Sequence, residues 1–96
     1  MTKSEFDTHV EGLCLRHHAS VTGGRRTQQR NAAIGGAPMS AHVYVKGCPK
    51  RTGKAADLEP DAGTKFARDE LAKDAQSLGM WTKVYDDHVH VHWRDA

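Results

Sequence analysis

Residues 87–93 read Asp87-His88-Val89-His90-Val91-His92-Trp93, and this stretch decides the fold. Because side chains alternate between the two faces of a strand, the three histidines would share one face and the three apolar side chains the other. We expect the apolar face to pack on helices. A row of histidines opposite an apolar row is typical of a metal site or of a solvated, hydrogen-bonded strand face, and the stretch alone favours neither.

The region before this strand predicts a hairpin and a helix. Residues 80–85 alternate as a second strand, and Asp86 and Asp87 supply the turn between the two strands. Upstream, Thr64 can cap a helix that Gly79 ends. Apolar side chains recur along one side of that helix, at Phe66, Ala67, Leu71, Ala75 and Leu78.

The N-terminal region predicts a second helix, over about residues 4–16, and then a short strand over residues 19–22. Residues 2–5 have the form of a capping box, and apolar side chains follow at helical spacing, at Phe6, Val10 and Leu13. The basic end of this helix suits the helix dipole and explains its histidines. We therefore do not expect His9, His17 or His18 to be metal ligands.

The middle of the chain predicts a brief helix over residues 27–34 and then a hairpin. Its two strands would be residues 42–46 and 54–58, joined by a basic segment rich in turn formers. Pairing of these strands would bring His42 close to Asp57 although the two residues are distant in the sequence.

The length predicts a single domain over residues 1–96. The helices and strands predicted above make it a small α+β domain, with two or three helices packed on a short antiparallel sheet. The net charge of +2 is too small to imply a nucleic-acid partner. No apolar run is long enough for membrane insertion, and no signal peptide is evident, so we expect a protein made in soluble form in the cytoplasm. Cys14 and Cys48 are expected to be reduced.

Three stretches together resemble a known family: Arg26 to His42, which includes Asn-Ala-Ala-Ile-Gly-Gly-Ala-Pro, then Gly53-Lys54-Ala55-Ala56-Asp57, then Asp87-His88-Val89-His90. The resemblance is to the D-alanyl-D-alanine carboxypeptidase and dipeptidase family of zinc peptidases. That family includes phage endolysins that cut peptidoglycan peptides and has hedgehog-type fold relatives. The similar core spans residues 22–93 and follows an N-terminal helical segment, residues 1–18.

The resemblance implies that His42, Asp57 and His90 hold Zn²⁺ at a site on the sheet. It also implies that Asp87 is the catalytic base, that Arg26 contacts the substrate carboxylate or the developing oxyanion, and that Ser40 is a substrate contact. Three protein ligands suit a catalytic zinc, because the fourth position stays open for water and a nearby carboxylate can take its proton. In a regular strand Asp87 and His90 would face opposite ways, so Asp87 has to belong to the turn.

The chain departs from the family pattern in two places near the site. Val43 to Ala56 separate the first histidine from the aspartate, where the compact family motif has about six residues. His92 stands where many relatives carry an acidic residue, and we expect it to be a supporting or exposed strand histidine. The same expectation holds for His88.

These features predict a zinc peptidase that acts, as a monomer, on peptidoglycan or related D-amino-acid peptides, in a phage or prophage context. One alternative is an HUH-type DNA nuclease, because Tyr85 to Val91 resembles the His-hydrophobic-His strand of those proteins. Another is a zinc-stabilised binding module without turnover.

Overall fold

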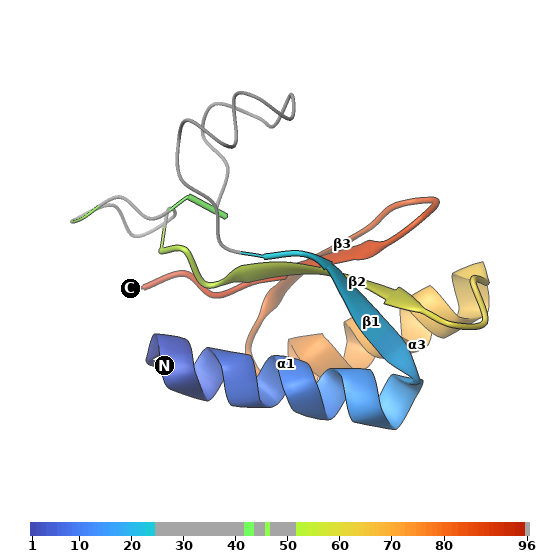
Figure 1. The fold of residues 1–96 in the computed structure, drawn as a ribbon, viewed down its shortest axis with the longest axis horizontal. Helices are drawn as coiled ribbons and strands as arrows, with labels where there is room; N and C mark the ends of the chain where they lie inside the picture. Colours follow the sequence, from blue (N-terminus) through green and yellow to red (C-terminus); the bar gives the residue numbers. More distant parts are fainter. Residues whose placement is uncertain (25–41, 44–45, 47–51, 96) are drawn as a thin grey trace.

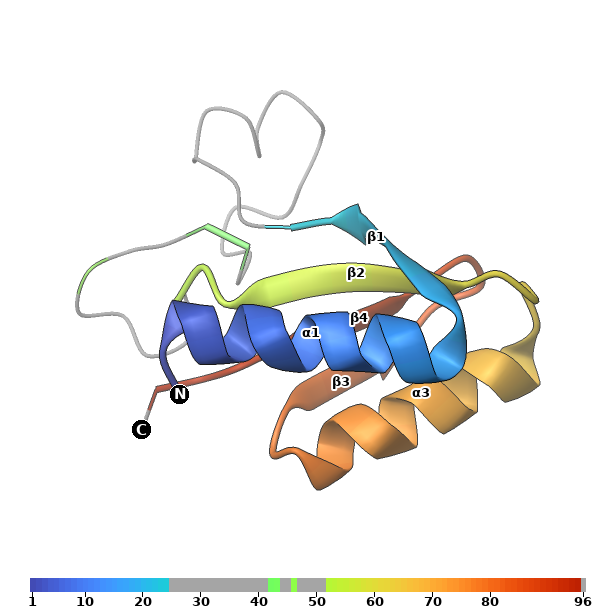
Figure 2. The same cartoon turned by 60° about the horizontal axis from the view of Figure 1, so that its bottom comes forward.

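The computed structural model describes residues 1–24, 42–43, 46 and 52–95. The chain forms α1 (Lys3–His17), β1 (Ala19–Gly23), β2 (Ala55–Pro60), α3 (Lys65–Ser77), β3 (Trp81–Val84) and β4 (Val89–His92). The strands make one antiparallel sheet in the order β1-β2-β4-β3. Both helices cover the same face of this sheet (Figures 1 and 2). The α+β prediction, with helices packed on a short antiparallel sheet, is confirmed.

Helix α1 begins and ends close to the predicted boundaries because its capping signals are local. The backbone N–H of Glu5 donates to Thr2 Oγ1 at 3.1 Å, and the N–H of Thr2 donates to Glu5 Oε1 at 3.0 Å, which completes the capping box. His18 ends the helix in the left-handed conformation, with φ of 48°. The buried face consists of Phe6, Val10 and Leu13, as the spacing predicts.

Helix α3 is capped by Thr64, whose hydroxyl oxygen accepts from the N–H of Ala67 at 3.2 Å. Its buried residues are Arg68, Leu71, Ala72 and Ala75. The prediction that Phe66 faces the core is wrong, since its side chain is 75% exposed. At about 100° per residue, Phe66 lies far around the helix from Leu71 and so falls outside the buried stripe.

The strand register separates a core face from a polar face. Leu58 pairs with Val89 on the face that packs on the helices. The side chains of Leu58, Val89 and Val91 are all fully buried. Trp93 packs against the same core. Gly79, with φ of 87°, links α3 to β3, and a Cβ there would approach Trp93 to 3.0 Å. Strands β3 and β4 pair antiparallel, with Trp81 opposite His92 and Val84 opposite Val89, which confirms the predicted hairpin.

The predicted hairpin of residues 42–46 with 54–58 is not what the structure shows. Of the first predicted strand, residues 44 and 45 lie outside the described residues, while His42 lies in a turn and Val43 forms an isolated bridge. The reason is that a strand has two edges, and β2 already pairs with β1 on one edge and with β4 on the other. The predicted helix over 27–34 lies outside the described residues, as do Arg26, Ser40 and Cys48.

Across the described part of the chain, no helix combines the length and the apolar content needed to cross a membrane. Cys14 is a free, half-buried thiol in α1, as expected.

Candidate metal centre

The pairing of β2 with β4 places Asp57 directly opposite His90. The neighbouring pairs, Leu58 with Val89 and Ala56 with Val91, point into the core. Alternation therefore turns both polar side chains outward. The apolar positions of the two strands fix the register that brings this carboxylate and this imidazole together.

His42 joins the pair from the chain segment that precedes β2. Its Nε2 lies 3.2 Å from Asp57 Oδ1 and 3.2 Å from His90 Nδ1, and His90 Nδ1 lies 3.1 Å from Asp57 Oδ1. These three atoms could hold a metal ion. Ligand atoms about 2.0–2.1 Å from a tetrahedral zinc ion are about 3.3 Å apart, so the observed triangle has the size that zinc requires.

The orientation of His42 is fixed by the backbone. Its Nδ1 lies 2.8 Å from the carbonyl oxygen of Gly24. A carbonyl oxygen can only accept, so Nδ1 carries the proton and donates it. In a neutral imidazole the lone pair is then on Nε2, the atom that faces Asp57 and His90. A histidine that binds a metal through one ring nitrogen commonly donates a hydrogen bond from the other, as His42 does here.

The second ring nitrogen of His90 contacts His92. The Nε2 of His90 lies 2.7 Å from His92 Nδ1, and Arg94 Nε donates to His92 Nε2 at 3.1 Å. If Nδ1 of His90 bound a metal, its Nε2 would carry the proton and donate it to His92, whose own proton would then be on Nε2. Metal binding and the Arg94–His92 hydrogen bond therefore exclude each other. Burial and the charges of His90 and Arg94 lower the pKa of His92 to about 4.

The carboxylate of Asp57 is confined on its other side by β1. A Cβ on Gly23 would lie 2.8 Å from Asp57 Oδ2, so only a glycine leaves room for the carboxylate in its present position. Burial raises the pKa of Asp57, but in the metal-free protein with His42 and His90 protonated, their hydrogen bonds and charges outweigh burial, and the pKa is well below its usual range. Asp57 is therefore ionised, as a metal ligand must be.

Asp87 lies in the turn between β3 and β4, as its predicted role required. Its side chain is 86% exposed, and its Oδ1 is 2.6 Å from His88 Nδ1. His88 is half-buried, stacks on Tyr85, and places its Nε2 3.9 Å from Asp57 Oδ1. Asp87 is thus connected to the candidate ligands through His88. Arg26 and Ser40 lie outside the described residues, so their places relative to the cluster stay predictions.

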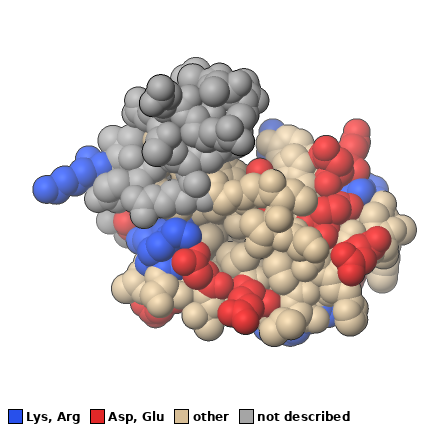
Figure 3. Space-filling model, in the orientation of Figure 1, with Lys and Arg blue, Asp and Glu red and all other residues tan. Residues whose placement is uncertain are grey.

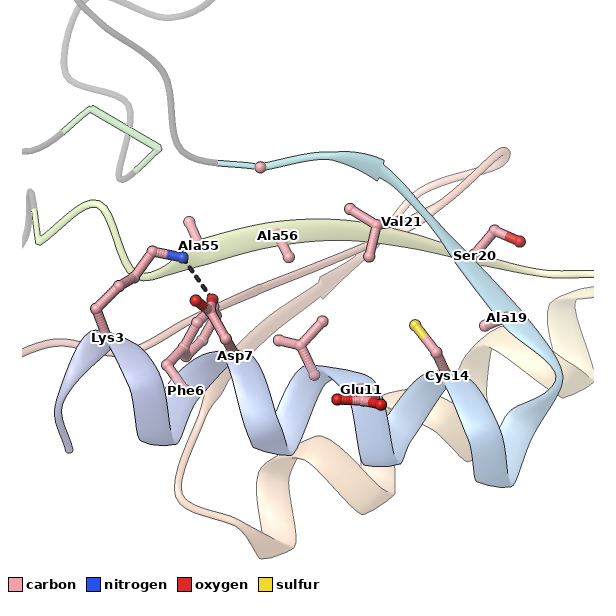
Figure 4. A pocket seen from close by; sticks show the side chains of 12 residues that line it. Lys3, Phe6, Asp7, Glu11, Cys14, Ala19, Ser20, Val21, Ala55 and Ala56 are labelled. Carbon is pink, nitrogen blue, oxygen red and sulfur yellow. Dashed lines mark hydrogen bonds and ion pairs between the residues drawn. The ribbon is translucent and has the colours of Figure 1, made fainter.

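A cavity lined by described residues lies elsewhere. It is a mainly apolar space of about 430 Å³ between α1 and strands β1 and β2, and it contains none of the three cluster side chains (Figure 4). Cys14 on α1 and Val21 on β1 face each other across it (Figure 4). Because carboxylate and imidazole donors converge at the cluster and not in this cavity, the cluster is the stronger candidate for chemistry.

Sequence reasoning missed three contributors to the site. Gly23 and Gly24 had no predicted role in the site, whereas Gly23 makes room for Asp57 and Gly24 supplies the carbonyl that orients His42. Arg94, which contacts His92, had no predicted role. A pair of glycines at the end of a strand is compatible with close packing against a neighbouring strand, but the sequence does not say which side chain approaches.

Comparison with known proteins agrees with this geometry. A model of the peptidase M15 family matches residues 10–92, which is most of the chain. Searches of curated proteins and of solved structures each give no significant match. The match includes all three residues of the cluster, and the chain belongs to the peptidase M15 family.

Proposed function

We propose that this member of the peptidase M15 family is a zinc-dependent peptidase that hydrolyses peptide bonds of peptidoglycan or of related D-amino-acid peptides. One observation carries the proposal: His42 Nε2, Asp57 Oδ1 and His90 Nδ1 converge with separations of 3.1–3.2 Å. Two imidazoles and one carboxylate are a donor set that suits a catalytic zinc and leaves a fourth position for water.

Zinc held by these three side chains would polarise the scissile carbonyl and make a bound water acidic enough to react near neutral pH. The carboxylate of Asp87 takes the proton of the attacking water and returns it to the departing amine. His88 holds that carboxylate through the hydrogen bond from its Nδ1. Arg26 binds the substrate carboxylate or the developing oxyanion, since a planar guanidinium suits both, and Ser40 contacts the substrate.

A zinc-stabilised binding domain without turnover is the second candidate. It is favoured by the placement of Asp87, whose carboxylate is 86% exposed and bonded to His88 instead of to the cluster. The DNA nuclease hypothesis for the same histidine strand has no comparable support, because the family match assigns residues 10–92 to peptidases. We place the enzyme at the bacterial cell wall, as a monomer whose partner is the peptide of peptidoglycan.

The first experiment measures zinc in the purified protein and in His90→Ala and Asp57→Ala. His9→Ala serves as the matched control, because His9 lies on α1 and not in the cluster. We expect equimolar zinc in the wild-type protein and in the control, and loss of zinc in both cluster variants. Zinc that persists in both would refute the ligand assignment.

The second experiment separates the enzyme from the binding domain. Asp87→Ala should retain zinc and lose cleavage of peptidoglycan fragments by at least about a hundredfold if Asp87 is the base. Unchanged cleavage would remove Asp87 from the mechanism. Absence of cleavage by the zinc-loaded wild-type protein would favour the binding domain.

A further inference from the structure

The space between α1 and β1 is not filled by side chains. Val21 on β1 pairs with Leu58 on β2, so these two side chains share the face of the sheet that the helices cover. Leu58 is fully buried, whereas Val21 is 53% exposed. A facing helix normally covers a valine at such a position. The exposure of Val21 therefore marks the mouth of the cavity of about 430 Å³ that lies between α1 and the strands (Figure 4).

The cavity exists because the strand residues around it are small. Protein interiors leave few voids larger than a water molecule, so a space of this size needs a cause. On the helix side, Phe6, Val10 and Cys14 recur at helical spacing and line the cavity. On the strand side, the described lining residues are no larger than valine, and they are Ala19, Ser20, Val21, Gly24, Ala55 and Ala56. These side chains are too short to reach α1, and the space stays open.

The floor of the cavity is apolar. Phe6, Val10 and Ala56 are buried there and belong to the main hydrophobic core. Burial raises the pKa of the Cys14 thiol, which agrees with apolar surroundings. The cavity volume falls in the range of about 300–1,000 Å³ that is usual for small-molecule sites. The body of a ligand that fits this floor is therefore apolar.

The rim of the cavity on the α1 side, formed by Lys3, Asp7 and Glu11, is acidic. Lys3 and Asp7 form an ion pair (Figure 4). Glu11, one turn further along the helix, is exposed and forms no ion pair within the part of the chain that the structure describes. One lysine and two acids leave one negative charge on the rim. Figure 3 shows acidic side chains along α1, beside uncharged surface toward β1. The rim attracts a cation and repels an anion.

We propose that this cavity is a binding site for a small organic cation, whose apolar body lies among Phe6, Val10 and Val21 and whose ammonium group lies beside Glu11. The site is on the helix side of the sheet, and none of the three side chains of the candidate metal centre lines it. Binding there is a property separate from the proposed peptidase activity, so either can hold without the other.

The test compares three probes that share a hexyl chain: hexylammonium, hexanol and hexanoate. The readout is the rate at which iodoacetamide alkylates Cys14, because a ligand in the cavity covers this thiol. All proteins in the test carry Cys48→Ser, which removes the other thiol of the chain. The zinc-loaded full chain is titrated with each probe into the millimolar range at constant ionic strength, and the Kd is taken from the dependence of the rate on probe concentration.

We expect hexylammonium to protect Cys14 with a Kd about fivefold lower than that of hexanol, and hexanoate to be the weakest probe. Glu11→Gln removes the charge and keeps the size of the side chain, so the ratio of the hexanol and hexylammonium Kd values should fall to about one. Glu70→Gln is the matched control, because Glu70 is an exposed acid on α3 that does not line the cavity.

A second variant tests the location of the site. Val21→Phe extends a half-exposed side chain into the cavity and should weaken protection by hexylammonium and hexanol by about tenfold or more. Val84→Phe is its control, since Val84 is another partly exposed strand valine, and it lies outside this cavity. Thermal unfolding of both variants checks that they are folded.

Four outcomes would overturn the proposal. The first is equal protection by hexylammonium and hexanol in the parent protein, or stronger protection by hexanoate. The second is a preference for hexylammonium that survives in Glu11→Gln, and the third is protection that is unchanged in Val21→Phe, since the probe would then bind elsewhere. The fourth is protection of Cys14 by a basic peptide and not by hexylammonium, which would identify a protein partner for this surface instead.

Discussion

Substitution of alanine for Gly23 should weaken zinc binding without weakening the fold. The added Cβ would lie 2.8 Å from Asp57 Oδ2, whereas ordinary contact begins at 3.4 Å, so the carboxylate must retreat by about half an ångström. A metal site tolerates displacements of only about that size. Changes beside a metal ligand typically cost about 10–100-fold in affinity, and we expect Gly23→Ala to fall in this range.

Gly24→Ala is the matched control, because it adds the same methyl group one residue later, keeps the carbonyl that contacts His42, and meets no atom of the described residues within 4 Å. Neither glycine has a positive φ, so alanine causes no backbone strain at either position. The assay is competition with a zinc-binding dye at neutral pH, together with denaturant unfolding of the metal-free proteins. Equal zinc affinity in the two variants would refute the argument that Gly23 makes room for Asp57. Loss of stability in metal-free Gly23→Ala alone would show a packing defect instead.

Three further predictions concern metal, pH and core. At free zinc about 100 times its Kd, binding adds about 2.7 kcal/mol to the unfolding free energy, so a chelator should lower Tm in the wild-type protein and not in Asp57→Ala. The pKa of Asp74 is lowered by Arg16 and His17, so these contacts stabilise the fold above the unfolded-state value of 3.8 and are lost as pH falls through the lower folded-state value. Asp74→Asn should therefore cost about 1 kcal/mol at neutral pH, in a denaturant titration, with a gap that closes below pH 4. Leu71→Ala removes a fully buried side chain and should cost about 3 kcal/mol in the same measurement, and a cost below about 1 kcal/mol would contradict its place in the core.

The elements with local signals were predictable from the sequence. The capping box at Thr2 and Glu5 and the stop at Gly79 act within a few residues, and both helices begin and end near the expected places. The alternation of residues 88–93 gave the correct face to each side chain of β4. Phe66 was misplaced because a single apolar residue in the first turn of a helix does not show which stripe is buried.

The strand pairing that brings the metal-binding residues together was not predictable from local signals. His42 and Asp57 do lie together, but not through the predicted hairpin, because strand partners are chosen by long-range packing and β2 is paired with β1 and β4. The carbonyl of Gly24 that contacts His42 is a backbone group, which every residue has. No residue type in the sequence can therefore predict this contact. The proximity of the ligands was implied by the family resemblance, whereas their support was visible only in three dimensions.

The register between β2 and β4 makes the metal a reporter of correct folding. A slip of one residue between these strands would send Val89 and Val91 into water and turn His90 toward the helices. Such a misfolded chain could keep its secondary structure and its compactness, yet its carboxylate and imidazole would no longer meet. Zinc uptake by freshly refolded protein would therefore count correctly aligned molecules, a quantity that circular dichroism cannot supply.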